Sequence, residues 1–92
     1  MVEKHVDFSV TATDSLRYWL TVDESGIELV NGIGGCDLEE SKEHVLVWSM
    51  TGNPGDALSI VGTQGLRTVV TVKDSKIPAG SSKGDGYRRF QV

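Results

Sequence analysis

Hydrophobic and polar residues alternate along most of this chain. In residues 5–12, Val6, Phe8 and Val10 alternate with polar side chains, and residues 16–22 show the same alternation. A period of two is typical of a strand that has one face on a core and the other face in water. The pattern therefore predicts β-strands over 5–12 and 16–22.

Short apolar segments separated by turn-forming residues continue to the C-terminus. Asp23-Glu24-Ser25-Gly26 predicts a turn with positive φ at Gly26, so that strands 16–22 and 27–30 form a hairpin. The segment 51–56 contains glycine and proline and predicts another turn, and Gln64-Gly65 predicts the turn of a second hairpin. The remaining predicted strands are 44–50, 57–63, 66–72 and 87–92.

The segment 44–50 is apolar on both faces, which predicts a central strand that is covered on both sides. We expect the core to come from the most apolar strands, with Leu20, Val45, Val47, Trp48, Val70 and Phe90 largely buried. Alternation does not reveal which face of strand 16–22 points inward. Either Tyr18 faces the core and Trp19 faces water, or the reverse holds.

Two segments lack any period and predict long loops. Residues 31–43 contain four acids and three glycines, and the spacing of Asp37 and Glu40 suits the cap of one helical turn. Residues 73–86 contain three glycines and three lysines, with Ile77 as the main apolar anchor. We expect both loops to act as recognition elements and the second one to be mobile.

Seven short strands without a long helical segment predict an all-β fold, a single domain over residues 1–92. The favoured architecture is an antiparallel two-sheet β-sandwich of immunoglobulin-like or jelly-roll type, and a small β-barrel is the alternative. Trp48 in its apolar strand resembles the buried tryptophan of immunoglobulin-like domains, whereas the flanking cysteine pair is absent because Cys36 is the only cysteine. Stability must therefore come from packing and not from a disulfide.

The net charge of −4 conceals an uneven distribution along the chain. Residues 1–46 hold ten acids and three bases, and residues 47–92 hold three acids and six bases. Interleaved strands would mix the two signs, whereas two faces of opposite sign would favour head-to-tail contact. Together with the open strand edges of a small sandwich, this division leads us to expect self-association.

The apolar runs are short, the run 45–48 being one of the longest, and a membrane-spanning helix needs about 20 such residues. The first eight residues also lack the basic and apolar regions of a secretory signal. We therefore expect a cytoplasmic protein without a membrane partner, although an excised domain would look the same.

Few residues suggest catalysis. Cys36 and His44 border the segment 31–43, and a reactive thiol would need the histidine within hydrogen-bond reach. A small enzyme centred on this pair is a minor alternative, and we expect no enzymatic activity.

The chain also offers little for phosphate or metal binding. The glycine cluster 32–35 lacks the helix, lysine and hydroxyl group of a phosphate-binding loop and predicts a flexible turn. Four nearby acids are spaced unlike a calcium loop and predict a solvated acidic surface: Asp37, Glu39, Glu40 and Glu43. No cofactor or metal ion is expected.

Binding residues are easier to nominate. Trp19 or Tyr18 could stack on a sugar ring or anchor a protein contact. The charged candidates are Asp37, Glu39, Glu40, Lys76, Lys83, Arg88 and Arg89. Arginines interleaved with aromatic residues could contact nucleic acid, but the acidic net charge argues against this partner. We therefore predict a non-catalytic module for protein–protein association, including self-association, with carbohydrate binding as the alternative.

Overall fold

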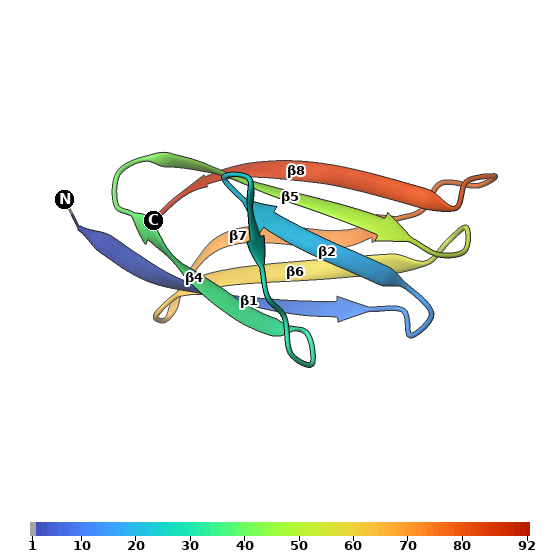
Figure 1. Ribbon diagram of the computed structural model, residues 1–92, viewed down its shortest axis with the longest axis horizontal. Helices are drawn as coiled ribbons and strands as arrows, with labels where there is room; N and C mark the ends of the chain where they lie inside the picture. The colour runs from blue at the N-terminus through green and yellow to red at the C-terminus, as the bar shows by residue number, and fades with distance from the viewer. Residues whose placement is uncertain (1) are drawn as a thin grey trace.

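The computed structural model describes residues 2–92, which form two antiparallel four-stranded sheets stacked as a sandwich (Figure 1). One sheet has the strand order β4-β1-β6-β7, with bounds Ile33–Glu39, Glu3–Ala12, Ala57–Gln64 and Arg67–Lys76. The other has the order β3-β2-β5-β8, with bounds Ser25–Ile27, Arg17–Val22, Glu43–Thr51 and Lys83–Gln91. The predicted all-β sandwich is confirmed, with eight strands instead of seven. Within the described range, no helix is long and apolar enough to cross a bilayer.

Alternate residues of each strand fill the space between the two sheets. Val6, Phe8 and Val10 of β1 are buried there, as the twofold pattern predicts. Phe8 and Phe90, from opposite sheets, meet edge to face with ring centroids 6.4 Å apart. Of the predicted core residues, four are buried: Leu20, Trp48, Val70 and Phe90.

Strand β5 is central in its sheet but is covered on one face only. Its even-numbered residues point into the core, whereas Val47 is 39% exposed and Val45 is half-buried. The prediction that both valines belong to the core is therefore wrong. The physical reason is that a two-sheet sandwich covers only the inner face of each strand, so the outer face of even an apolar central strand meets water.

Both segments predicted as long loops contain strands. β4 pairs with β1, with Gly34 opposite Phe8, and β8 pairs with β5, with Gly86 opposite Trp48. A Cβ atom on Gly86 would overlap the Trp48 ring, so glycine leaves room for the large side chain on the neighbouring strand. The predicted helical turn at 37–40 is wrong as well, because Asp37 lies within β4.

The connections that remain are 40–42 and 77–82. Ile77 anchors the second of these as predicted, because its side chain is only 2% exposed. The amide of Ile77 donates to the Asp56 carbonyl at 2.9 Å, and the Gly55 amide donates to the Ile77 carbonyl at 3.0 Å. The segment is therefore fastened to the β5–β6 turn at its start.

The pairing of both predicted hairpins is confirmed, β2 with β3 and β6 with β7, but the second strand of the first hairpin is Ser25–Ile27 instead of the predicted 27–30. In the first turn the positive φ angles belong to Asp23 and Glu24, at 50° and 70°, whereas Gly26 lies in β3. The predicted turn geometry is therefore wrong at Gly26. Asp23 accepts a hydrogen bond from the Val45 amide at 2.9 Å, which holds this turn against β5.

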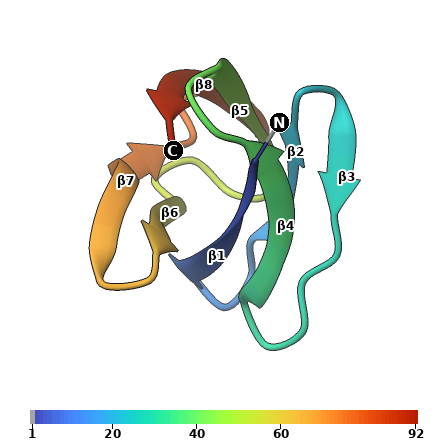
Figure 2. The ribbon, with the colours of Figure 1, turned by 90° about the vertical axis from the view of Figure 1, so that its left-hand side faces the viewer.

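The two halves of the chain occupy different sides of the sandwich. Viewed end-on, the edge strands β3 and β4 lie on one side, and β7 and β8 lie on the other (Figure 2). β3 and β4 come from the acidic half of the sequence, and β7 and β8 come from the basic half. The strands of the acidic and basic halves are therefore not interleaved, and the two signs of charge are separated in space.

Candidate functional site

The outer face of the β3-β2-β5-β8 sheet carries large exposed side chains on three adjacent strands. Trp19 on β2 is 53% exposed, Val47 on β5 is 39% exposed and Tyr87 on β8 is 60% exposed. Val47 is paired in register with both Thr21 and Tyr87, and Trp19 precedes Thr21 by two residues. The three side chains therefore point to the same side of the sheet, and we call them the aromatic face.

The two rings of the aromatic face are separated by β5. Since neighbouring strands lie about 4.8 Å apart, the Trp19 and Tyr87 backbones are about 10 Å apart across the sheet and about 7 Å apart along it. Beside Tyr87 is a depression of about 330 Å³, lined by Val45, Val47, Ser49, Asp85, Gly86 and Tyr87. The shape suits a broad, flat contact.

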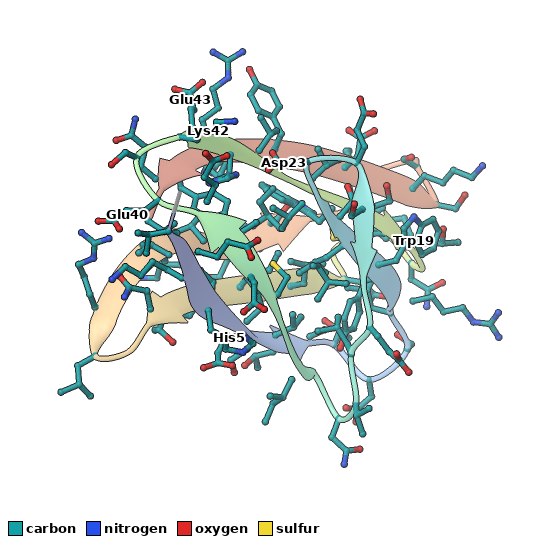
Figure 3. All side chains as sticks on the ribbon, turned by 60° about the vertical axis from the view of Figure 1, so that its left-hand side comes forward. His5, Trp19, Asp23, Glu40, Lys42 and Glu43 are labelled. Atoms are coloured by element: carbon teal, nitrogen blue, oxygen red, sulfur yellow. The ribbon has the colours of Figure 1, made fainter. Side chains whose placement is uncertain are left out.

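The orientation of strand 16–22 is now defined. Leu20 and Val22 are buried, and Tyr18 shares their side of β2, where it is half-buried against the core. Trp19 therefore faces outward, and in Figure 3 it lies apart from the labelled charged residues. Tyr18 instead lines a depression with Gly32 at the start of β2, so it does not belong to the aromatic face.

The outer face of the other sheet is more polar and carries a histidine between two carboxylates. His5 Nδ1 lies 2.8 Å from Asp37 and Nε2 lies 3.0 Å from Asp7, all on exposed side chains (Figure 3 labels His5). The hydrogen bond to Asp37, with a further one to Asp7, raises the pKa of His5 above its usual value. This places the predicted candidate Asp37 in a surface ion-pair cluster.

His44, at the start of β5, is buried and bonded through both ring nitrogens. Nδ1 donates to the Asp23 carboxylate at 2.6 Å, and Nε2 donates to the Glu39 carbonyl at 2.8 Å. Burial alone lowers the pKa of His44, but the bond to Asp23 and the bond to the Glu39 carbonyl raise it above its usual value overall. Two acceptors require hydrogen on both nitrogens, so the ring is an imidazolium that joins the β2–β3 turn and the end of β4 to β5.

The Cys36–His44 pair lacks the arrangement that nucleophilic catalysis needs. Burial raises the pKa of the half-buried Cys36 thiol, and nearby Asp37 and Asp23 raise it further. Both nitrogens of His44 already donate to other groups, so the ring offers no free base. Within residues 2–92, no three His, Cys, Asp or Glu side chains are grouped so that they could hold a metal ion.

The other acidic candidates lie near the β4–β5 connection. Glu39 forms an ion pair with Lys42 at 2.7 Å. The exposed Glu40 is fixed through its backbone, because its amide donates to the Val2 carbonyl at 2.8 Å. Figure 3 shows Glu40, Lys42 and Glu43 together near this connection.

The basic candidates are spread along β7 and β8. Lys76 and Lys83 flank the connection 77–82. The guanidinium carbon of Arg88 lies 5.4 Å from the centroid of the Trp48 ring, and Arg89 Nε lies 3.8 Å from a Glu43 carboxylate oxygen. The acidic and basic candidates therefore do not converge into one pocket.

Two members of the aromatic face are absent from the sequence-based candidates. Val47 and Tyr87 could have been found from alternation alone. If Trp48 and Phe90 point inward, the odd-numbered residues of their strands must point outward. That these two residues lie beside Trp19 depends on the pairing register of three strands. The pattern of a single strand does not reveal that register.

These assignments come from the chain's own geometry. Comparison with protein-family models, with curated proteins and with solved structures found no match.

Proposed function

We propose that this protein is a non-catalytic β-sandwich module whose aromatic face mediates protein–protein association. The supporting observation is that Trp19, Val47 and Tyr87 are exposed together on one sheet. Tryptophan and tyrosine provide large contact areas with few rotatable bonds, and they are enriched among the residues that dominate binding energies.

The surroundings of these residues favour a protein partner. Val47 and the half-buried Val45 give the face an apolar centre, and Asp85 and Arg89 lie beside them on β8. An apolar centre with a polar rim is the usual composition of a protein interface.

One observation supports carbohydrate binding as a second candidate. Trp19 is paired in register with Ser49, and Ser49 is paired with Asp85. An aromatic plane beside a hydroxyl group and a carboxylate could stack on a sugar ring and bind its hydroxyl groups.

A peptide-display selection against the folded protein tests the first proposal. The affinity of each enriched peptide is then measured for Trp19→Ala, Tyr87→Ala and the control Leu66→Ala. Leu66 is a fully exposed apolar residue in the β6–β7 turn, away from the aromatic face. A dominant contact is worth at least about 2 kcal/mol, so Trp19→Ala or Tyr87→Ala should weaken binding about 30-fold while Leu66→Ala leaves it unchanged.

Two results would contradict the proposal that the aromatic face binds protein. Peptides that bind all three variants equally well would place the binding surface elsewhere. If no peptide is enriched but a glycan array shows binding that is lost in Trp19→Ala and Asp85→Ala, the carbohydrate function replaces the protein-binding one.

A further inference from the structure

The two sides of the sandwich carry opposite charge. Residues 23–43, which include β3 and β4, hold seven acids against one lysine, a net charge of −6 with histidines excluded. Residues 67–89, which include β7 and most of β8, hold six bases against two acids, a net charge of +4. We call these segments the acidic edge and the basic edge, and Figure 2 shows their strands on opposite sides of the molecule.

Both edges present strands that end their sheets. β4 and β3 have no strand beyond them in the sheet order, nor do β7 and β8, within the part of the chain that is described. A groove of about 420 Å³ between β3 and β4 is lined by the consecutive residues 35–39 of β4. Consecutive residues 86–89 of β8 line a depression on the basic side. An edge strand directs half of its backbone N–H and C=O groups away from its sheet, where another strand could pair with them.

The topology makes the two edges complementary in direction. Each sheet has four strands, and all neighbouring strands are antiparallel. The two edges of each sheet therefore run in opposite directions: β4 against β7, and β3 against β8. Consider a second copy that is related to the first by a sideways translation without rotation. Its β7 would lie beside β4 of the first copy and its β8 beside β3, and both pairs would be antiparallel.

The charges also match in position along the strands. Following the register across one sheet, Asp37 on β4 and Arg67 on β7 lie at the same level within about one residue. In the other sheet, Glu24 beside β3 and Arg89 on β8 likewise lie at the same level along the strands. Sideways displacement would therefore bring carboxylates of one copy toward guanidinium groups of the next.

We propose that the acidic edge of one copy binds the basic edge of a second copy. The contact joins different surfaces, so it can repeat and produces an open row of molecules instead of a closed dimer. A contact with two-fold symmetry would place the acidic edge against a second acidic edge, or the basic edge against a second basic edge, and the like charges would repel. Of the aromatic face, Trp19 and Val47 lie on the inner strands β2 and β5, and only Tyr87 lies on an edge strand, so the inference does not rest on the proposed function.

Charge reversal at each edge provides the test. One variant carries Glu24→Lys and Asp37→Lys, so its acidic edge presents lysines to Arg67 and Arg89 of the next copy. The other carries Arg67→Glu and Arg89→Glu, so its basic edge presents glutamates to Glu24 and Asp37 of the next copy. All four side chains are exposed, so each variant should stay folded, which circular dichroism and thermal unfolding verify.

Sedimentation equilibrium at low ionic strength should show the parent's average mass rising with concentration beyond that of a dimer, and falling again as salt is added. Each variant alone should associate about 100-fold more weakly or worse, because like charges now meet. An equimolar mixture of the two variants should recover the association, since the new lysines of one then face the new glutamates of the other, and the unaltered edges keep their original pairing. The control Trp19→Ala should assemble like the parent.

Three results would overturn the inference. The first is a parent that stays monomeric at millimolar concentration and low salt. The second is a parent mass that levels off at a dimer. The third is association that both charge-reversed variants retain at the parent's strength.

Discussion

Replacing Gly86 by alanine tests the packing between β8 and the buried tryptophan. A Cβ atom at position 86 would lie 2.8 Å from Cε2 and 3.0 Å from Cη2 of Trp48. The ring has little freedom to retreat, because it is 2% exposed and its Nε1–H donates to Ser75 Oγ at 3.0 Å. Arg88 covers it as well.

The expected magnitude follows from two opposing effects. Forcing an extra methyl group into a packed core costs about 1–3 kcal/mol. Replacing glycine restricts the unfolded chain, which offsets about 0.4–1 kcal/mol of that loss. We therefore expect Gly86→Ala to lower the free energy of unfolding by about 1–2 kcal/mol, with a melting temperature lower by about 4–16 °C.

Urea unfolding monitored by tryptophan fluorescence measures this change. Gly26→Ala on β3 is the matched control, because Gly26 is on an edge strand of the same sheet and a Cβ atom there meets nothing within 4 Å. The control should stay within about 0.5 kcal/mol of the parent. Shrinking the ring with Trp48→Phe should reduce the penalty of Gly86→Ala, and a double-mutant cycle measures that coupling. If Gly86→Ala is as stable as Gly26→Ala, the proposed packing is wrong.

Further expectations concern the core, the histidine pair and the outer face. Trp48→Ala should cost about 3–5 kcal/mol in denaturant unfolding, and a loss below about 1 kcal/mol would remove this residue from the core. The folded pKa of His44 is raised above its usual value of 6.5, so its contribution to stability is complete below that pH and is lost as pH rises through the folded pKa. Unfolding free energies at a series of pH values should therefore begin to fall as the pH rises above 6.5, and Asp23→Asn should flatten that fall. Equal slopes would contradict the His44–Asp23 pairing. Trp19→Ala should change stability by no more than about 0.5 kcal/mol, and a larger loss would show that this side chain supports the fold.

The sandwich was predictable because one-sided burial leaves a twofold pattern. Strand β1 shows it most clearly, with Val6, Phe8 and Val10 all buried. β4 and the first residues of β8, 83–86, were missed because glycine is rare in strands and usually indicates a turn. Gly86 lies in a strand here because the Trp48 ring on the paired strand occupies the space beside it. At Gly34 that space is occupied by the Glu28 carbonyl and the Leu29 side chain. A single segment's pattern contains no information about these neighbours.

The candidate site was also predictable from the sequence only in part. Trp19 was identified as a binding residue from its aromatic character, but its outward direction needed the burial of Leu20 and Val22 on the opposite side of β2. Its association with Val47 and Tyr87 needed the register of three strands. The uneven charge was visible in the sequence, whereas its separation onto two edges needed the order of strands within both sheets.

Chemical-shift mapping of the ¹⁵N-labelled protein with a display-selected peptide tests the proposed binding surface most directly. The account predicts that the largest shifts occur at the outward positions of β2, β5 and β8, including the Trp19 indole N–H, and that Leu66 is unaffected. Shifts confined to the outer face of the β4-β1-β6-β7 sheet, or to either charged edge, would contradict the assignment of binding to the aromatic face.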